Sequence, residues 1–217
     1  MRAVWAGLAG LAALGAPSPA HAHPHIFIDT AIEVVFAPDG RAEGVRLRWT
    51  YDEFFSLSLV AERGLDPDFD AVLTPEELAA LNGFDMNWQP GFQGDTYALM
   101  GAMPVALSGP SDWTVAFEGG KLISTHYRRF EAPLDLGAEA LIVQAYDPGY
   151  YTAYTVVDAT VTGRAGCTVD LYEPDREAAD QILQEALAEF AGDEAAEADF
   201  PAVGAAYAEE ARIGCAG

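Results

Sequence analysis

The chain has 217 residues, of which 51% are hydrophobic, so it can form a sizeable core. It carries 34 Asp and Glu against 11 Lys and Arg, a formal net charge of −23 at pH 7. This charge excludes nucleic acid as a natural partner, because a phosphate backbone binds basic surfaces. It favours cations as ligands, although acidity also serves solubility alone.

The N-terminus has the features of a secretory signal peptide. Arg2 precedes an apolar run rich in Ala, Gly and Leu, and the stretch "APSPAHA" ends in the small residues that signal peptidase reads. Cleavage after Ala22 removes residues 1–22 and leaves residues 23–217 as a single mature domain. The apolar run is too short to span a bilayer comfortably. We therefore expect a periplasmic protein without membrane insertion.

Hydrophobic periodicity predicts a chain of strands interrupted by helices. Period-two alternation predicts a hairpin first, and the period then changes to that of helices. A Gly- and Pro-rich stretch follows from about residue 85, and strand-like segments come after it. The predicted strands are 26–36, 45–51, 113–130 (two strands joined by Gly-Gly), 140–147, 151–163 and 167–172, and the predicted helices are 52–65, 74–82, 175–192 and 200–215.

About seven short strands with regular turn signals predict a mainly β protein, specifically a β-sandwich. We expect an inserted EF-hand-like helical pair at 52–84 and a helical C-terminal tail at 174–217. In an oxidising compartment Cys167 and Cys215 are most simply a disulfide. A thiolate metal site would need more ligands than the nearby sequence offers.

The stretch "HPHIFID" predicts a transition-metal site at the mature N-terminus. His23 and His25 share one face of a strand, with Cβ atoms roughly 6–7 Å apart, so both imidazoles can reach one ion. The free α-amine of His23 adds a third ligand. Pro24 excludes the square-planar amino-terminal copper or nickel motif, because it has no amide hydrogen. Imidazole ligands suit zinc, nickel, cobalt or copper.

Two further residues are candidates for this site. Asp29 shares the face but lies about 13 Å from His25, so we place it behind the ligands rather than among them. His126 could complete the site if its strand pairs beside the first strand. The alternatives are an ordinary strand histidine at position 126 and a terminus that merely contains two histidines.

The acidic stretch "DPDFDAVLTPEE" matches the calcium-loop pattern of an EF-hand. Hard oxygen ligands in this spacing fit calcium better than imidazole-binding metals. Three interpretations stay open: a calcium site, a loop that has lost calcium, and coincidence. The ligand positions are Asp66, Asp68, Asp70, Val72 through its carbonyl, Thr74 and Glu77.

One position departs from the calcium-loop pattern. The sixth position is normally Gly with a left-handed backbone, and here it is Ala71, at a cost of about 1 kcal/mol. "TPEE" is also a capping box, so Glu77 could simply cap a helix that begins after Thr74. Both roles coincide in an EF-hand.

Together these motifs resemble an uncharacterised bacterial family described as the periplasmic component of an ABC-type transport system. The resemblance rests on "AHAHPHIFID", "LTPEEL", "YDPGYY" and "VGAAYAEEARIGC". It implies association with nickel/cobalt-type permeases, and it carries over His23, His25 and Asp29 as the shared motif and Asp66, Asp68, Asp70 and Glu77 as the loop. Members typically have Gly where this chain has Ala71.

We therefore expect an accessory protein that binds a divalent transition metal for an inner-membrane metal permease, with structural calcium in the loop. We expect no enzyme, because no Ser/His/Asp or Cys/His nucleophile arrangement is evident and a copper oxidase would need a third imidazole-type ligand. The alternative is a non-catalytic envelope interaction module stabilised by calcium and the disulfide.

Overall fold

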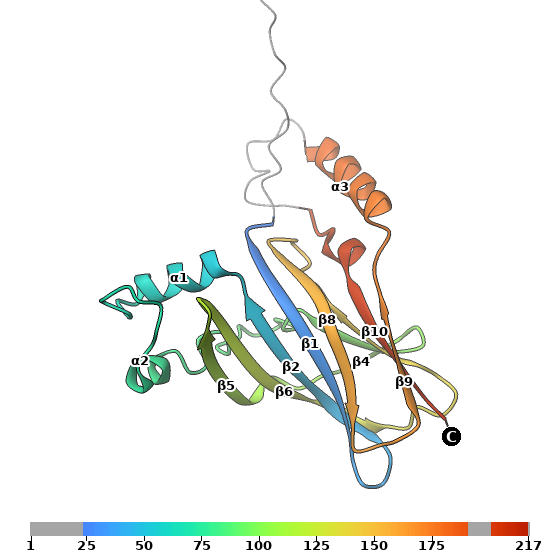
Figure 1. The fold of residues 1–217 in the computed structure, drawn as a ribbon. Helices are drawn as coiled ribbons and strands as arrows, with labels where there is room; N and C mark the ends of the chain where they lie inside the picture. The colour runs from blue at the N-terminus through green and yellow to red at the C-terminus, as the bar shows by residue number, and fades with distance from the viewer. Residues whose placement is uncertain (1–23, 191–200, 217) are drawn as a thin grey trace, which may run out of the picture.

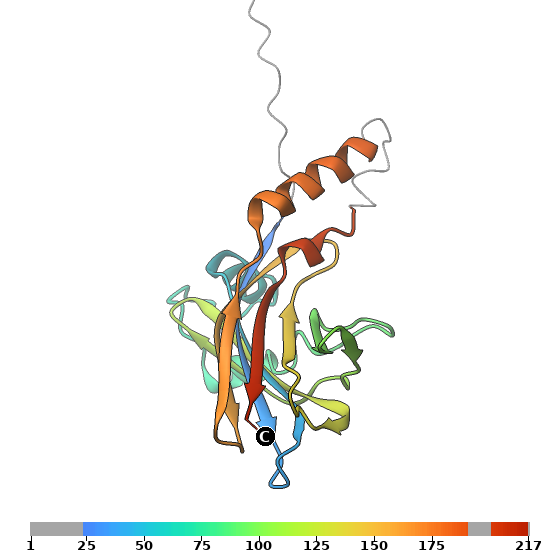
Figure 2. The ribbon, with the colours of Figure 1, turned by 90° about the vertical axis from the view of Figure 1, so that its right-hand side faces the viewer.

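The computed structural model describes residues 24–190 and 201–216. Within this part the chain forms two five-stranded sheets (Figures 1 and 2). The first, in the order β5-β6-β2-β1-β8, comprises β1 (Ile26–Phe36), β2 (Ala42–Tyr51), β5 (Ser111–Glu118), β6 (Lys121–Leu134) and β8 (Thr152–Thr162). The second, in the order β4-β3-β7-β10-β9, comprises β3 (Thr96–Met100), β4 (Met103–Val105), β7 (Leu141–Ala145), β9 (Cys167–Tyr172) and β10 (Glu209–Cys215).

The first sheet is built around the predicted N-terminal hairpin. β1 and β2 pair antiparallel, with Ile32 opposite Leu47, and both side chains are fully buried. The turn between the strands contains Gly40 at φ +83°, which glycine adopts without steric cost. β1 also pairs with β8 in parallel. Since β8 lies far along the chain, this pairing follows from tertiary packing and not from a local pattern.

The second sheet contains the main correction to the sequence prediction. Residues 200–215, expected to be helical, form the short 3-10 helix η2 (Gly204–Tyr207) and the strand β10. Alternate residues of β10 are buried, from Glu209 to Cys215, so a period of two governs this segment. β10 lies between β7 and β9, and pairing on both edges outweighs the helix propensity of its Ala and Glu residues.

The seven predicted strands are all present, and the mainly β class is confirmed. The strands β3, β4 and β10 were not predicted. One buried hydrophobic cluster draws side chains from both sheets, including Leu47 of the first and Val143 and Ile213 of the second. Polar contacts also join the sheets. The Tyr154 hydroxyl donates to Asp95 Oδ2 at 2.9 Å, and the Val156 N–H donates to Glu209 Oε2 at 2.7 Å.

Three helices flank the sheets in the described part of the chain. α1 (Glu53–Glu62) begins at Asp52, whose side chain accepts the Phe55 N–H. α2 (Pro75–Ala80) lies close to α1 beside β5 and β6, and α3 (Arg176–Phe190) lies at the end of the molecule where β1 begins (Figure 1). No described helix is long and apolar enough to cross a membrane.

Candidate metal sites

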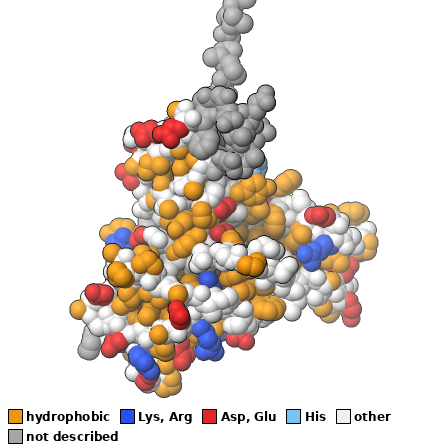
Figure 3. Space-filling view, turned by 180° about the vertical axis from the view of Figure 1, so that it is seen from behind, with side chains coloured by type: hydrophobic (Ala, Val, Ile, Leu, Met, Phe, Trp, Pro, Cys, Tyr) orange, Lys and Arg blue, Asp and Glu red, His pale blue; other side chains and the backbone are white. Residues whose placement is uncertain are grey.

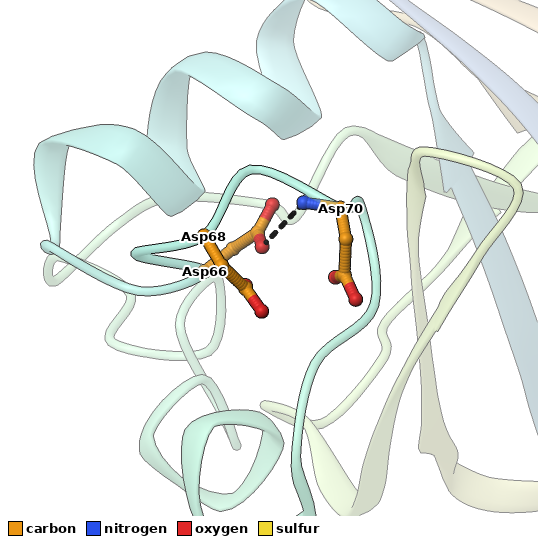
Figure 4. Close-up of side chains that lie close together, drawn as sticks. All are labelled: Asp66, Asp68 and Asp70. Atoms are coloured by element: carbon orange, nitrogen blue, oxygen red, sulfur yellow. Dashed lines mark hydrogen bonds between the residues drawn. The ribbon is translucent and has the colours of Figure 1, made fainter.

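The loop between α1 and α2 brings three carboxylates together. Oxygen atoms of Asp66, Asp68 and Asp70 lie within 4.8 Å of one another (Figure 4). In residues 24–190 and 201–216 this is the one group of three or more metal-ligating side chains at such spacing. Asp66 is buried, whereas Asp68 and Asp70 are exposed. The three aspartates that the sequence pattern pointed to therefore do lie close together in the structure.

Backbone N–H groups hold the carboxylate of Asp66 in place. Its Oδ1 accepts the Asp70 N–H and its Oδ2 accepts the Ala71 N–H, each at 3.1 Å. The Asp70 carboxylate in turn accepts the Val72 N–H at 2.8 Å. These bonds hold the carboxylates of Asp66 and Asp70 against the backbone of the loop.

Glu77 closes the loop from the far side. Its Oε1 accepts the Asp66 N–H at 3.2 Å, and its Oε2 accepts the Thr74 N–H at 2.9 Å. The Thr74 hydroxyl also accepts the Glu77 N–H, which completes a capping box at the start of α2. The predicted capping box is therefore present, and the same glutamate reaches back to the first loop position.

Ala71 adopts the backbone that the sixth loop position requires. Its φ is +58°, in the left-handed region where a Cβ costs about 1 kcal/mol. Asp66 and Phe69 also have positive φ, at +54° and +56°. The loop thus takes a tightly wound path even though glycine is missing.

Like charges crowd this loop. A backbone hydrogen bond lowers the pKa of Asp68, but the neighbouring charges of Asp70 and Asp66, together with desolvation, outweigh it and the pKa is raised. Hydrogen bonds from the backbone and side chain of Thr74 lower the pKa of Glu77. A hard divalent cation would relieve the repulsion among the aspartates, and carboxylate oxygens are the ligands that calcium prefers.

The N-terminal histidine site is only partly within the described residues. His25 is exposed just before β1, its N–H donates to the Tyr151 carbonyl at 2.8 Å, and its ring centroid lies 4.8 Å from that of Tyr151. His23 lies outside the described residues. Asp29 is exposed on the same face of β1, four residues and about 13 Å further along the strand.

His126 does not join the N-terminal histidines, which corrects one expectation. It lies on β6 opposite Leu47 of β2, which is opposite Ile32 of β1, so β6 is not the neighbour of β1. Ile32 is seven positions from His25, which separates the two imidazoles by more than about 20 Å. The His126 side chain is fully buried, with Trp49 and Trp88 packed edge-on at 4.6 and 5.6 Å.

A partly buried carboxylate that bonds to side chains of β2 and β6 was missed from the sequence. Asp85 accepts hydrogen bonds from the Tyr51 and Ser124 hydroxyls, and burial raises its pKa. Neither ring nitrogen of His126 has a hydrogen-bond partner among the described residues, and burial, then the charge of Arg128, lowers its pKa to about 3. "FDMNW" gives no signal for this contact, because the loop meets β2 and β6 only in three dimensions.

The predicted disulfide is present. Cys167 of β9 and Cys215 of β10 lie directly opposite each other and are joined by an S–S bond. The residues are 48 apart in sequence, and a loop of that length gives about 4 kcal/mol of stabilisation in the chain-entropy model. The bond joins β9, which precedes α3, to β10, which follows it.

Residues 8–215 match the family described as a protein of unknown function, DUF1007. The chain belongs to the DUF1007 family. The expected membership in an uncharacterised family is thereby confirmed. The part of the chain that matches DUF1007 includes both histidines of "HPH", the acidic loop and both cysteines. The DUF1007 description names neither a transport role nor a metal. A search of curated proteins finds no match.

Proposed function

We propose that this protein is an exported, non-catalytic accessory protein that binds divalent metal ions. In this proposal the loop from Asp66 to Glu77 binds calcium as a structural ion. The N-terminal histidines, His23 and His25, bind zinc, nickel, cobalt or copper and exchange it with an inner-membrane permease. We further propose that the two sheets form a sandwich that carries α1 and α2 as an EF-hand-like insertion.

The convergence of Asp66, Asp68 and Asp70 carries this proposal. Three carboxylates within 4.8 Å repel one another, and a divalent cation between them would relieve that repulsion. Glu77 supports it, because its carboxylate is already hydrogen-bonded to the first loop position. Calcium binding there would hold the end of α1 to the start of α2.

The position of His25 supports the transition-metal part. Its side chain is exposed at the beginning of β1, directly after the predicted mature terminus. A carrier needs ligands that a permease can reach, and an exposed imidazole at a chain end meets that need. The disulfide is consistent with an oxidising compartment such as the periplasm.

A second candidate function is a non-catalytic envelope interaction module. Phe54 on α1 is 80% exposed and Phe69 in the acidic loop is 83% exposed, which is uncommon for phenylalanine. Seen from behind, the surface also carries broad apolar areas between scattered charges (Figure 3). Apolar side chains exposed in this way are typical of protein contact surfaces.

Metal analysis of the exported protein tests the proposal. Mass spectrometry should find near-stoichiometric calcium, and a zinc, nickel, cobalt or copper ion that is lost in a His23→Ala/His25→Ala variant. An Asp66→Asn/Asp70→Asn variant should lose calcium and keep the transition metal. His126→Leu is the matched control and should change neither.

The outcomes separate the two candidate functions. Calcium without any transition metal in the wild-type protein would contradict the carrier and support the interaction module. If neither metal class binds, the acidic loop is a folding motif and the proposed function is wrong.

A further inference from the structure

A cavity of about 130 Å³ opens where the ends of both sheets meet η2 and the start of α3. It lies apart from the acidic loop and adjoins the start of β1, where His25 packs against Tyr151. The "YDPGYY" stretch lines it together with residues from β1, β8, α3 and η2. Five of the twelve lining residues are aromatic: Phe27, Tyr146, Tyr150, Tyr154 and Tyr207.

Ring stacking and a hydrogen bond hold several of these rings in place. Tyr150 and Tyr207 stack at 4.0 Å, and the Tyr207 hydroxyl donates to Asp180 Oδ1 at 2.8 Å. Tyr146 stacks on Tyr97 at 4.1 Å. The rings are therefore positioned before any ligand arrives, which limits the entropy lost on binding.

Close backbone packing forms one wall of the cavity. A Cβ at Gly204 would lie 1.7 Å from the Asp147 carbonyl oxygen, so only glycine allows η2 to approach this turn. The Gly204 N–H donates to the Pro148 carbonyl at 3.0 Å. Tyr150 has φ +53°, a left-handed backbone that is costly for a tyrosine. The turn and η2 thus fit together at the expense of local strain.

The charges around the cavity favour a cation. Asp147 contributes a carboxylate that is fixed by the N–H groups of Gly149, Tyr151 and Thr152 at 2.9 to 3.0 Å. Arg176 is the one cationic side chain of the lining, and it is paired at 2.8 Å with the buried carboxylate of Glu209. Glu209 offsets the charge of Arg176, and Asp147 is the one carboxylate of the lining itself.

We propose that this cavity binds the methylated ammonium group of a small organic cation. Aromatic faces attract such groups through the ring quadrupole, and a nearby carboxylate strengthens the attraction. A trimethylammonium head is compact enough for a cavity of about 130 Å³. A free metal ion fits less well, because the lining is mostly apolar and offers one carboxylate that already accepts three hydrogen bonds.

Calorimetric titration with choline and with 3,3-dimethylbutan-1-ol tests this proposal. The two probes have nearly the same shape, but only choline is charged. Comparing their affinities for the wild-type protein therefore isolates the contribution of the positive charge. We expect choline to bind roughly tenfold more tightly, in line with a desolvated cation–π contact. Equal affinities would overturn the proposal in favour of an apolar cavity, and no binding of choline would overturn it as well.

Variants locate the binding on the cavity. Tyr150→Leu should weaken choline binding roughly tenfold, whereas Tyr150→Phe keeps the ring and should retain it. Tyr172→Leu replaces an exposed tyrosine outside the cavity and serves as the control. Each variant is first checked for an unchanged circular dichroism spectrum. Choline binding that survives Tyr150→Leu, or that is lost equally in Tyr172→Leu, would contradict the assigned cavity.

Discussion

The carboxylate of Glu77 accepts the backbone N–H of Asp66 at 3.2 Å, so the last ligand position of the acidic loop is already held against the first. The loop is closed by its own hydrogen bonds, and α2 begins at the residue that the capping box defines. A cation would therefore enter a loop that is largely formed. The affinity of the loop for a cation should depend on the strain of its backbone and on the number of carboxylates that reach the ion.

Replacing Ala71 with glycine should tighten calcium binding. Ala71 has φ +58°, and we expect ion coordination to hold this left-handed backbone more tightly than the free loop does. Removal of its Cβ should then recover about 1 kcal/mol in the bound loop, which corresponds to roughly a fivefold lower Kd. Isothermal titration with calcium measures the change. Ala61→Gly on the exposed side of α1 is the matched control and should leave the Kd unchanged while destabilising the helix. Equal Kd values for wild type and Ala71→Gly would show that the backbone at this position does not limit binding.

His126 should make the protein less stable in acid. Burial first, and then the charge of Arg128, lowers its pKa to about 3 in the folded state from the ordinary value of about 6.5. The unfolded chain therefore binds one more proton between these values, and the stability that His126 contributes is lost as the pH falls from about 6.5 towards 3. The slope is about 1.4 kcal/mol per pH unit.

Urea unfolding between pH 4 and 6.5 measures this effect against a His126→Leu variant. In the variant, unfolding no longer takes up the proton that binds to His126. Its free energy of unfolding should therefore decline less on acidification than that of wild type. Parallel pH profiles would show that His126 is protonated equally in the folded and unfolded states.

Asp95 should make the protein less stable as the pH rises, which is opposite to the effect of His126. Burial, then the charge of Asp147, raises its pKa to about 7 from 3.8, although the Tyr154 hydroxyl donates to it. The folded state therefore binds the extra proton, and this contribution to stability is lost as the pH rises from about 4 through 7. Asp95→Asn should remove this loss. Between pH 4 and pH 8 the stability of the variant relative to wild type should therefore rise by about 4 kcal/mol.

The two groups should nearly compensate each other between about pH 4 and 6.5. Relative to wild type, the plots of unfolding free energy against pH for His126→Leu and Asp95→Asn should therefore have slopes of opposite sign. The double variant should restore the wild-type slope. A double variant that follows either single variant would contradict the assignment of one of the two groups.

Loss of the disulfide should destabilise the paired strands β9 and β10. Cys167→Ser/Cys215→Ser should lower the free energy of unfolding by about 2–5 kcal/mol, because the unfolded chain is no longer constrained. Thermal unfolding with and without reductant provides the measurement. Reductant should lower the Tm of wild type towards that of the variant and leave the variant unchanged. A variant as stable as oxidised wild type would mean that the bond adds nothing to strand pairing.

Local patterns in the sequence determined much of this protein. Period-two alternation predicted seven strands, and the capping box at Thr74 and Glu77 placed the start of α2. The spacing of Asp66, Asp68 and Asp70 predicted convergence, because the calcium-loop pattern takes ligands from its first, third and fifth positions. The two cysteines, together with the predicted export signal, predicted the disulfide between Cys167 and Cys215.

Tertiary structure alone decided the rest. β10 was misread as a helix because its Ala and Glu residues favour helices, and only two neighbouring strands make it a strand. His126 could be separated from His25 only once β2 was known to lie between β1 and β6. The same reason applies to Asp85 with Tyr51 and to Tyr150 with Tyr207: each contact joins residues distant in sequence, and no local periodicity records which distant segments pack together.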